Sequence, residues 1–186
     1  MALMSGQLAP DFETTDIHGA SIAVRDFRGR RLMLAFFRFA ACPYCNLRVH
    51  ELMSKANLWQ DHLPIIAVFQ SPTETLLRHR NLQNFPARII ADPEMRLFHL
   101  YEGELSTAKF ITGHFRRVPQ WIQGVRAGAF DAGTTLGELR LVPAEMLIDE
   151  QGIIQRAYYG RDVTDHLPLR DVTRFAMGDM TAQSQG

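Results

Sequence analysis

The stretch FRFAACPYCNLRVHEL, residues 37–52, contains both cysteines of this 186-residue chain, Cys42 and Cys45, with only a proline and a tyrosine between them. An almost continuously apolar run, residues 32–39, leads into the pair, as expected of a strand buried on both faces. Beyond the pair, apolar side chains recur every three or four residues, which is typical of a helix packed on a sheet. These side chains are Val49, Leu52, Ala56, Trp59 and Leu63. The sequence therefore predicts the local order strand, cysteine pair, helix.

Strands and helices alternate after this unit. Apolar runs predict strands at 65–69, 88–91, 145–148 and 153–159. Helix signals predict helices at 71–84, 92–101 and 167–177, with Ser71 as the N-cap of the first. The alternation favours parallel pairing through crossovers, whereas the turn-like sequence DEQG at 149–152 favours an antiparallel hairpin near the end. We therefore predict an α/β fold with a central mixed sheet and helices on both faces.

The composition is that of an ordinary globular protein, with 46% hydrophobic and 22% charged residues. The 20 basic and 20 acidic side chains balance, so the charge predicts no nucleic-acid or anionic-membrane partner. No uncharged run approaches the ~20 residues of a membrane span, and residues 1–6 carry no export signal. We therefore expect a cytoplasmic protein, in which closely spaced cysteines are more often catalytic or metal-binding than a structural disulfide.

A single domain is expected over residues 1–186, with a polar tail from about residue 178 that frays. Residues 102–141 show no clear strand or helix pattern, but they contain several aromatic side chains and the basic pair Arg116–Arg117. We expect a helical insertion here. It could cap the core, cover the site or meet a second subunit in a homodimer, and additional core packing is the interpretation that we favour.

The cysteine pair has a spacing with chemical consequences. Cys42 is expected at the start of a helix, where free backbone N–H groups and the helix dipole stabilise an anion. In such pairs the thiol pKa can fall from about 8.5 to between about 3.5 and 7.5, which increases the fraction of nucleophilic thiolate. Cys45, one turn into the helix, can attack a mixed disulfide formed at Cys42. Pro43 suits the first turn because no amide hydrogen is needed there.

Other interpretations of the same segment remain open. Tyr44 is expected to be exposed beside the sulfurs, either as a contact for a peptide or small thiol or as a partial shield of the helix start. A closed zinc site needs four ligands, and the isolated histidines show no paired spacing, so no metal is expected. These histidines are His18, His50 and His62. Inert buried cysteines and an iron–sulfur cluster shared between two subunits are further alternatives.

Several stretches together resemble a known family. They are residues 6–19 (GQLAPDFETTDIHG), residues 24–29 (VRDFRG) and the apolar run at 34–39 before the cysteines. In this order they are similar to the opening of the alkyl hydroperoxide reductase and thiol-specific antioxidant family, the peroxiredoxin-like branch of the thioredoxin superfamily. Residues 141–152 (LVPAEMLIDEQG) resemble a later landmark of that superfamily. The resemblance leaves residues 102–141 uncovered and implies a thioredoxin-like fold.

The resemblance also implies roles for two later residues. Pro143 would be a cis-proline that faces the cysteine pair, and Val142 would offer its backbone to an extended substrate. The alternative is an ordinary trans proline leading into an edge strand. The tetrad Cys-Pro-Tyr-Cys is also that of glutaredoxins, which exchange disulfides with glutathione. Glutaredoxins, however, are shorter and lack the long segment that precedes the cysteines here.

The chain departs from the family pattern just before Cys42. Peroxiredoxins carry a proline and a threonine or serine that shape the peroxide pocket, and Ala35 and Phe39 stand at these positions. Neither residue supplies a hydroxyl group to orient a peroxide. Arg38 and Arg48 could partly compensate by steadying a thiolate or oxyanion, although such arginines are more often solvated or paired. The dipeptide Asp165–His166 could be a proton shuttle, but a turn leading into the last helix is the interpretation we favour.

The leading hypothesis is a peroxiredoxin-like thiol-disulfide oxidoreductase with Cys42 as nucleophile and Cys45 as resolving thiol. Its substrate would be a disulfide or, less favoured, a hydroperoxide. A cellular dithiol of the thioredoxin or glutathione system would then reduce the disulfide formed between Cys42 and Cys45. No bound organic cofactor is expected. The alternatives are a true peroxidase that uses the same pair and a catalytically inactive binding module on the same fold.

Overall fold

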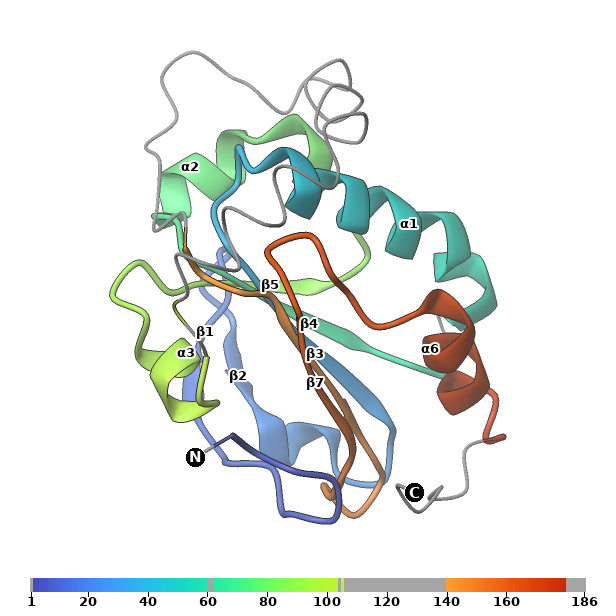
Figure 1. Ribbon diagram of the computed structural model, residues 1–186. Coiled ribbons are helices and arrows are strands. Elements are labelled where there is room, and N and C mark those ends of the chain that lie inside the picture. Colours follow the sequence, from blue (N-terminus) through green and yellow to red (C-terminus); the bar gives the residue numbers. More distant parts are fainter. Residues whose placement is uncertain (1, 60–61, 104, 106–139, 180–186) are drawn as a thin grey trace.

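The computed structural model describes residues 2–59, 62–103, 105 and 140–179. A five-stranded sheet with the order β5-β4-β3-β6-β7 lies at its centre (Figure 1). The strands are β3 (Leu32–Phe37), β4 (Ile65–Phe69), β5 (Arg88–Ala91), β6 (Ala144–Ile148) and β7 (Ile154–Tyr159). The first three are parallel to one another, whereas β6 runs antiparallel to both β3 and β7. The predicted mixed sheet is therefore confirmed.

Helices cover both faces of this sheet (Figure 1). On one face lie α1 (Pro43–Trp59), α2 (Thr73–Arg78), the 3-10 turn η2 (Arg80–Leu82) and α6 (Leu169–Ala176). On the other lie the short hairpin β1 (Glu13–Thr15) and β2 (Ser21–Ala23), the 3-10 turn η1 (Val24–Phe27) and α3 (Arg96–Leu100). The α/β prediction with helices on both faces is confirmed.

Strand β3 shows why one apolar run is needed to support two layers. Successive side chains of a strand point to opposite faces. Met33, Ala35 and Phe37 pack on the side of α1 and α6, whereas Leu34 and Phe36 pack on the side of α3. All the residues of β3 are consequently buried. Because β3 is the middle strand of the five, the cysteines that follow it lie at the centre of the row of strand ends.

The hairpin β1–β2 is not anticipated by the apolar pattern. Its strands are only three residues long, and β1 is polar. The turn between them is held by Asp16, whose carboxylate accepts hydrogen bonds from the amides of His18 and Ala20 at 3.0 and 2.9 Å. A strand this short and polar leaves no periodicity to detect, so the turn chemistry is its main signal.

The helix that follows β4 is shorter than predicted, because α2 ends at Arg78 and a 3-10 turn follows. The predicted N-cap is also wrong, since Pro72 occupies that position. The Ser71 hydroxyl instead accepts a hydrogen bond from the amide of Ala40 at 3.1 Å. Ser71 therefore fixes the loop that leads from β3 to the cysteines rather than the helix beside it.

We expect Ser71→Ala to destabilise the protein by about 1–3 kcal/mol, because the buried amide of Ala40 would lose its acceptor. Urea unfolding measures this change. Thr73→Ala, at the partly buried start of α2, is the matched control. Equal effects of the two substitutions would contradict the role given to the Ser71 hydroxyl.

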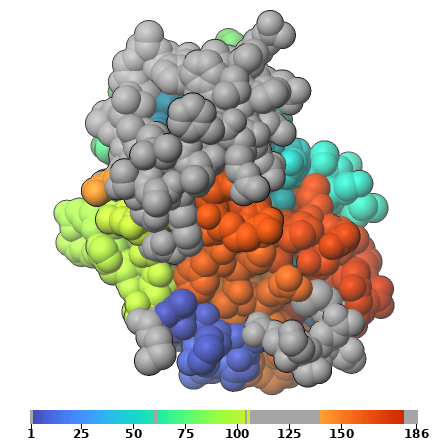
Figure 2. Space-filling model, viewed as in Figure 1, coloured from blue at the N-terminus to red at the C-terminus, as the bar shows by residue number. Residues whose placement is uncertain are grey.

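The loop between β7 and α6, residues 160–168, returns to the same end of the sheet as the start of α1 (Figure 1). Strand β7 is an edge strand, and it forms part of the molecular surface together with this loop (Figure 2). Residues 104, 106–139 and 180–186, which include most of the predicted insertion and tail, lie outside the described residues. No helix within the described ranges is long and apolar enough to cross a membrane.

Candidate active site

The cysteines lie at the junction of β3 and α1. Helix α1 begins at Pro43, so that Cys42 immediately precedes its first turn and Cys45 lies within it. The backbone amide of Cys45 donates a hydrogen bond to the Cys42 sulfur at 3.3 Å. Both cysteines are free thiols in this structure. The Cys42 sulfur thus lies where unpaired helix amides favour an anion.

Arg38 provides a positive charge at the same sulfur. It follows β3 directly, is only 2% exposed, and places Nη2 at 3.0 Å from the Cys42 sulfur. Its guanidinium also lies over the rings of Phe39 and Tyr44, at 5.9 and 5.8 Å from their centroids. A buried guanidinium held on two aromatic faces is a fixed charge, so little reorganisation is needed to stabilise a thiolate.

The two thiols differ in acidity. Burial alone would raise the pKa of the Cys42 thiol, but the Cys45 thiol, the Arg38 charge and nearby backbone amides outweigh it and lower this pKa to about 5. Burial and the neighbouring Cys42 raise the pKa of Cys45 well above its ordinary value. The pair therefore contains one thiolate and one protonated thiol at neutral pH, which suits an attacking and a resolving cysteine.

Asn46 fixes the backbone around Cys42. Its amide Nδ2 donates to the carbonyl oxygens of Ala40 and Cys42 at 2.7 and 2.9 Å. Its Oδ1 accepts a hydrogen bond from Asn81 at 2.8 Å, which ties the helix start to the η2 turn. Asn46 and Asn81 are not predicted from the sequence, because a single asparagine has no distinctive spacing. A position four residues after Cys42 is the only available signal.

Both sulfurs are enclosed in this conformation. Cys42 is 0% exposed, Cys45 1% and Tyr44 4%. The prediction that Tyr44 is exposed is therefore wrong; the ring packs against the Arg38 guanidinium, which supplies a reason for its burial. Any compound that reacts with the Cys42 sulfur can therefore reach it only after local opening of the structure.

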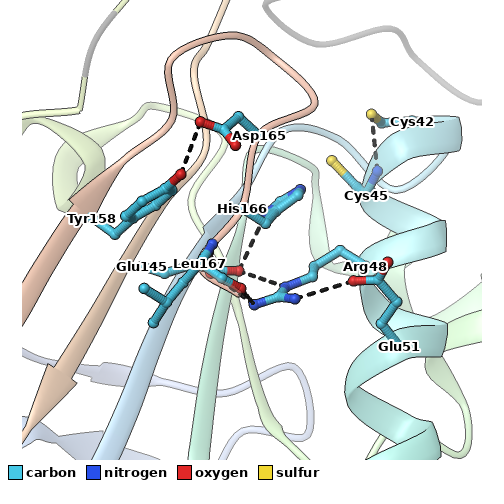
Figure 3. Close-up of polar contacts among 9 residues, drawn as sticks. All are labelled: Cys42, Cys45, Arg48, Glu51, Glu145, Tyr158, Asp165, His166 and Leu167. Atoms are coloured by element: carbon cyan, nitrogen blue, oxygen red, sulfur yellow. Dashed lines mark hydrogen bonds and ion pairs between the residues drawn. The ribbon is translucent and has the colours of Figure 1, made fainter. Parts of the chain in front are cut away.

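Arg48 is paired with a carboxylate, which is the interpretation favoured from the sequence over a role in steadying a thiolate. It lies one turn beyond Cys45 on α1 and makes a two-pronged ion pair with Glu145 of β6, with Nε–Oε1 at 2.8 Å and Nη2–Oε2 at 2.9 Å (Figure 3). The two side chains are 2% and 1% exposed. A buried charge requires an opposite charge nearby, and Glu145 satisfies this requirement for Arg48.

Glu145 connects this pair to the loop before α6. Its carboxylate lies 3.1 Å from Nδ1 of His166 and accepts a hydrogen bond from the amide of Leu167 at 2.8 Å. Burial would raise the pKa of Glu145, but Arg48 and His166 lower it to about 2. Glu145 is not predicted as a site residue from the sequence. The available signal is a single acidic residue in the otherwise apolar strand β6.

The sequence model of the AhpC/TSA family matches residues 5–172. The chain belongs to the AhpC/TSA family. The predicted resemblance is confirmed.

Individual relatives agree with this assignment. Two proteins of Mycobacterium tuberculosis, each named "Putative peroxiredoxin", are 24% identical to this chain over 166 residues, which cover 89% of it and 90% of the relative. Among solved structures, a thiol peroxidase from Chromobacterium violaceum has a TM-score of 0.65 at 15% identity, over 96% of this chain and 88% of its own. The thioredoxin domain of a thiol-disulfide oxidoreductase from Bacteroides vulgatus has a TM-score of 0.54 at 16% identity, over 94% and 99%. The fold is thioredoxin-like, as predicted.

This AhpC/TSA chain differs from expectation at Pro143. Within the described residues no peptide bond is cis, so the bond between Val142 and Pro143 is trans and the predicted cis-proline is wrong. The trans form is the intrinsically favoured one for X–Pro, by about 0.5–1 kcal/mol. The Pro143 carbonyl accepts a hydrogen bond from the amide of Gly160 at 2.9 Å, and the Val142 side chain is buried.

The AhpC/TSA chain also lacks a hydroxyl group at the two positions before Cys42 noted above. Ala35 lies within β3 and Phe39 follows Arg38, and both side chains are part of the apolar core on the α1 side.

The described residues contain no group of three or more histidine, cysteine or acidic side chains arranged to hold a metal ion.

Proposed function

We propose that this AhpC/TSA protein is a thiol-disulfide oxidoreductase in which Cys42 is the nucleophile and Cys45 the resolving thiol. The observation that supports this assignment best is the environment of the Cys42 sulfur, with Arg38 Nη2 at 3.0 Å and the Cys45 amide at 3.3 Å. Both groups stabilise a thiolate, which is the reactive form of cysteine.

The reaction proceeds in two exchanges. The Cys42 thiolate attacks one sulfur of a substrate disulfide, forms a mixed disulfide and expels the other sulfur as a thiolate. Cys45 then loses its proton and attacks the Cys42 sulfur, so that the second half of the substrate leaves as a thiol. The substrate disulfide is reduced to two thiols and the cysteine pair is oxidised. A cellular dithiol of the thioredoxin or glutathione type returns the pair to the reduced state.

A disulfide is preferred to a peroxide as the substrate because of what surrounds Cys42. Ala35 and Phe39 offer no hydroxyl hydrogen bond to a peroxide oxygen, and both are packed in the core. Tyr44, Val142 and Pro143 are the proposed contacts for the substrate once the site opens.

The cytoplasm, which keeps thiols reduced, is the proposed location of the protein.

Membership of the AhpC/TSA family supports a second candidate, a hydroperoxide reductase that uses the same pair. Arg38 would then stabilise the developing charge on the peroxide oxygen, and Cys42 would pass through a sulfenic acid. The rate at which hydrogen peroxide oxidises Cys42, compared with the rate for free cysteine at the same thiolate fraction, separates the two candidates. A large excess over free cysteine favours the peroxidase.

The central experiment traps the substrate on Cys42. In Cys45→Ser the resolving thiol is absent, so a mixed disulfide formed at Cys42 accumulates and its partner can be identified by mass spectrometry after acid quenching. The double variant Cys42→Ser/Cys45→Ser is the matched control and should capture nothing. If Cys45→Ser captures no thiol compound or protein, the proposed thiol-disulfide oxidoreductase fails, and a sulfenic acid on Cys42 in its place would favour the hydroperoxide reductase.

The reduction potential tests the remaining alternative, an inactive binding module. A working redox pair should have a potential within the range of about −120 to −270 mV that thioredoxin-fold enzymes span. Equilibration with defined ratios of reduced and oxidised glutathione measures it. A pair that never forms a disulfide under these conditions would favour the binding module.

A further inference from the structure

His166 has a buried nitrogen atom that is not explained by the hydrogen bonds around it. Its side chain is 9% exposed, and its Nδ1 lies 3.1 Å from the Glu145 carboxylate. Nε2, the second ring nitrogen, is buried and has no hydrogen-bond partner within the described part of the chain. Buried polar atoms are rarely left unpaired, so each exception calls for an explanation.

The bond to Glu145 determines which nitrogen of the neutral ring carries the proton. A carboxylate only accepts hydrogen bonds, so Nδ1 must be the donor. Nε2 of the neutral ring then has a free lone pair and can accept a proton. Glu145 remains ionised, because Arg48 and His166 together hold the pKa of its carboxyl at about 2. The carboxylate can therefore also stabilise the ring after it has gained a charge.

Cys45 lies on the side of α1 that faces Glu145 and His166 (Figure 3). Cys45 and Arg48 are three residues apart and therefore lie on one face of the helix. Arg48 and His166 both contact the same oxygen atom, Oε1 of Glu145. Figure 3 shows the His166 ring between Glu145 and Cys45, with its free nitrogen on the side of the cysteines.

We infer that His166, oriented by Glu145, accepts the proton of Cys45 when this thiol attacks Cys42. This inference rests on the proposed function and deepens its second step. Cys45 needs such a base because it lies in a buried site that disfavours its ionisation. No hydrogen bond joins Nε2 to Cys45 before reaction; catalytic hydrogen bonds are often long in the free enzyme and tighten in the reacting complex.

The proton that leaves Cys45 is passed through His166 to the departing thiolate. The S–H bond of Cys45 breaks as an N–H bond forms at Nε2, the Cys45 thiolate attacks the Cys42 sulfur, and the departing thiolate takes the proton from Nε2. His166 returns to its neutral form in each cycle. Glu145 stays charged throughout and acts as a positioning residue.

A polar cavity of about 330 Å³ also reaches this histidine, between α1 and the loop before α6. Arg48, Glu51, Asp165 and His166 are among its lining residues. Of the charged groups here, Glu51 is paired with Arg48 and Asp165 with Arg161.

The test separates the two exchanges. The full-length protein is mixed with oxidised glutathione, quenched with acid at intervals and weighed by mass spectrometry, which distinguishes the glutathione adduct from the internal disulfide. In His166→Asn the amide nitrogen can still donate to Glu145 but cannot take up a proton. We expect adduct formation within about 2-fold of wild type and closure of the internal disulfide slowed by about 100-fold, because a general base contributes 10²–10⁴-fold.

Two further variants make the outcome decisive. His50→Asn, on the exposed side of α1, should change neither step. In His166→Ala, added imidazole should speed closure, because it can occupy the space left by the ring. The inference is overturned if His166→Asn closes as fast as wild type, if adduct formation and closure slow equally, or if imidazole leaves His166→Ala unchanged. If the wild-type protein and Cys45→Ser form no adduct at all, the proposed function itself has failed.

Discussion

Glu145→Gln is expected to destabilise the protein by about 3–5 kcal/mol, the usual cost of removing one partner from a buried ion pair. Arg48 would then be a charged group with 2% exposure and no carboxylate at β6. The amide of Leu167 and the ring of His166 would also lose their charged acceptor. Urea unfolding at neutral pH measures the change.

Two comparisons identify the ion pair as the cause. In Arg48→Met/Glu145→Leu both charges are removed, and most of the stability should return, because well-packed apolar residues often replace a buried pair at little cost. Glu94→Gln, which breaks an exposed pair with Arg96, should leave the midpoint unchanged. A loss of stability in the double variant as large as that in Glu145→Gln would contradict this explanation.

The pH dependence of stability provides an independent check on Glu145. Its pKa in the folded protein, about 2, lies below the ordinary value of 4.5. The unfolded chain therefore binds more protons between these values, and stability falls as the pH falls from about 4.5 to about 2. The double variant should show a smaller fall in this range.

Arg38→Met is expected to reduce the Cys42 thiolate at pH 7 by about 30-fold or more. At a pKa of about 5 nearly all of the thiol is ionised at pH 7, whereas at the ordinary value of about 8.5 only about 3% is. Burial raises the pKa of Cys42, and the guanidinium 3.0 Å from the sulfur counteracts this effect. Without the guanidinium the pKa therefore rises. The ultraviolet absorbance of the thiolate, followed over pH, measures the ionised fraction without a reagent that must enter the site.

Arg38→Lys and Arg78→Met are the matched controls for this titration. Lysine keeps a positive charge near Cys42 and should preserve part of the shift, whereas Arg78 is exposed at the end of α2 and should not affect it. An unchanged titration of Cys42 in Arg38→Met would mean that the helix amides alone stabilise the thiolate. The assigned role of Arg38 would then be wrong.

The folding stability of the reduced protein should depend on pH through the ionisation of Cys42. The pKa of Cys42 is lowered to about 5 on folding, so the reduced protein gains stability as the pH rises from about 5 towards the ordinary cysteine value and loses it as the pH falls. Arg38→Met should lose most of this pH dependence.

The fold was largely predictable because its main signals are local. The apolar run of β3, the spacing of apolar residues in α1 and the late hairpin each depend on residues close together in the chain. The prediction failed where a side chain had a competing partner elsewhere. Ser71 is a good N-cap by type, but the amide of Ala40 takes its hydroxyl group.

In the candidate site, too, the features that depend on neighbouring residues could be predicted and those that depend on distant partners could not. The position of Cys42 at the helix start follows from its place between a strand and a helix, and Arg38 is close to it in the sequence. Arg48 was a reasonable candidate for the same role by proximity, yet Glu145, which arrives on β6, binds it instead. Glu145 and His166 come from distant parts of the chain, so no sequence spacing could connect them with the cysteines.

The sequence by itself determined the order of strand, cysteine pair and helix, and with it the position of one sulfur at a helix start. These features depend on backbone geometry and on the period of apolar residues, which are properties of short segments. Only the tertiary structure decided which buried charges meet. Antiparallel pairing of β6 with β3 brings Glu145 under α1, and the return of the chain before α6 adds His166. A buried charge or proton acceptor is defined by its neighbours in space, and these are set by the packing of distant segments.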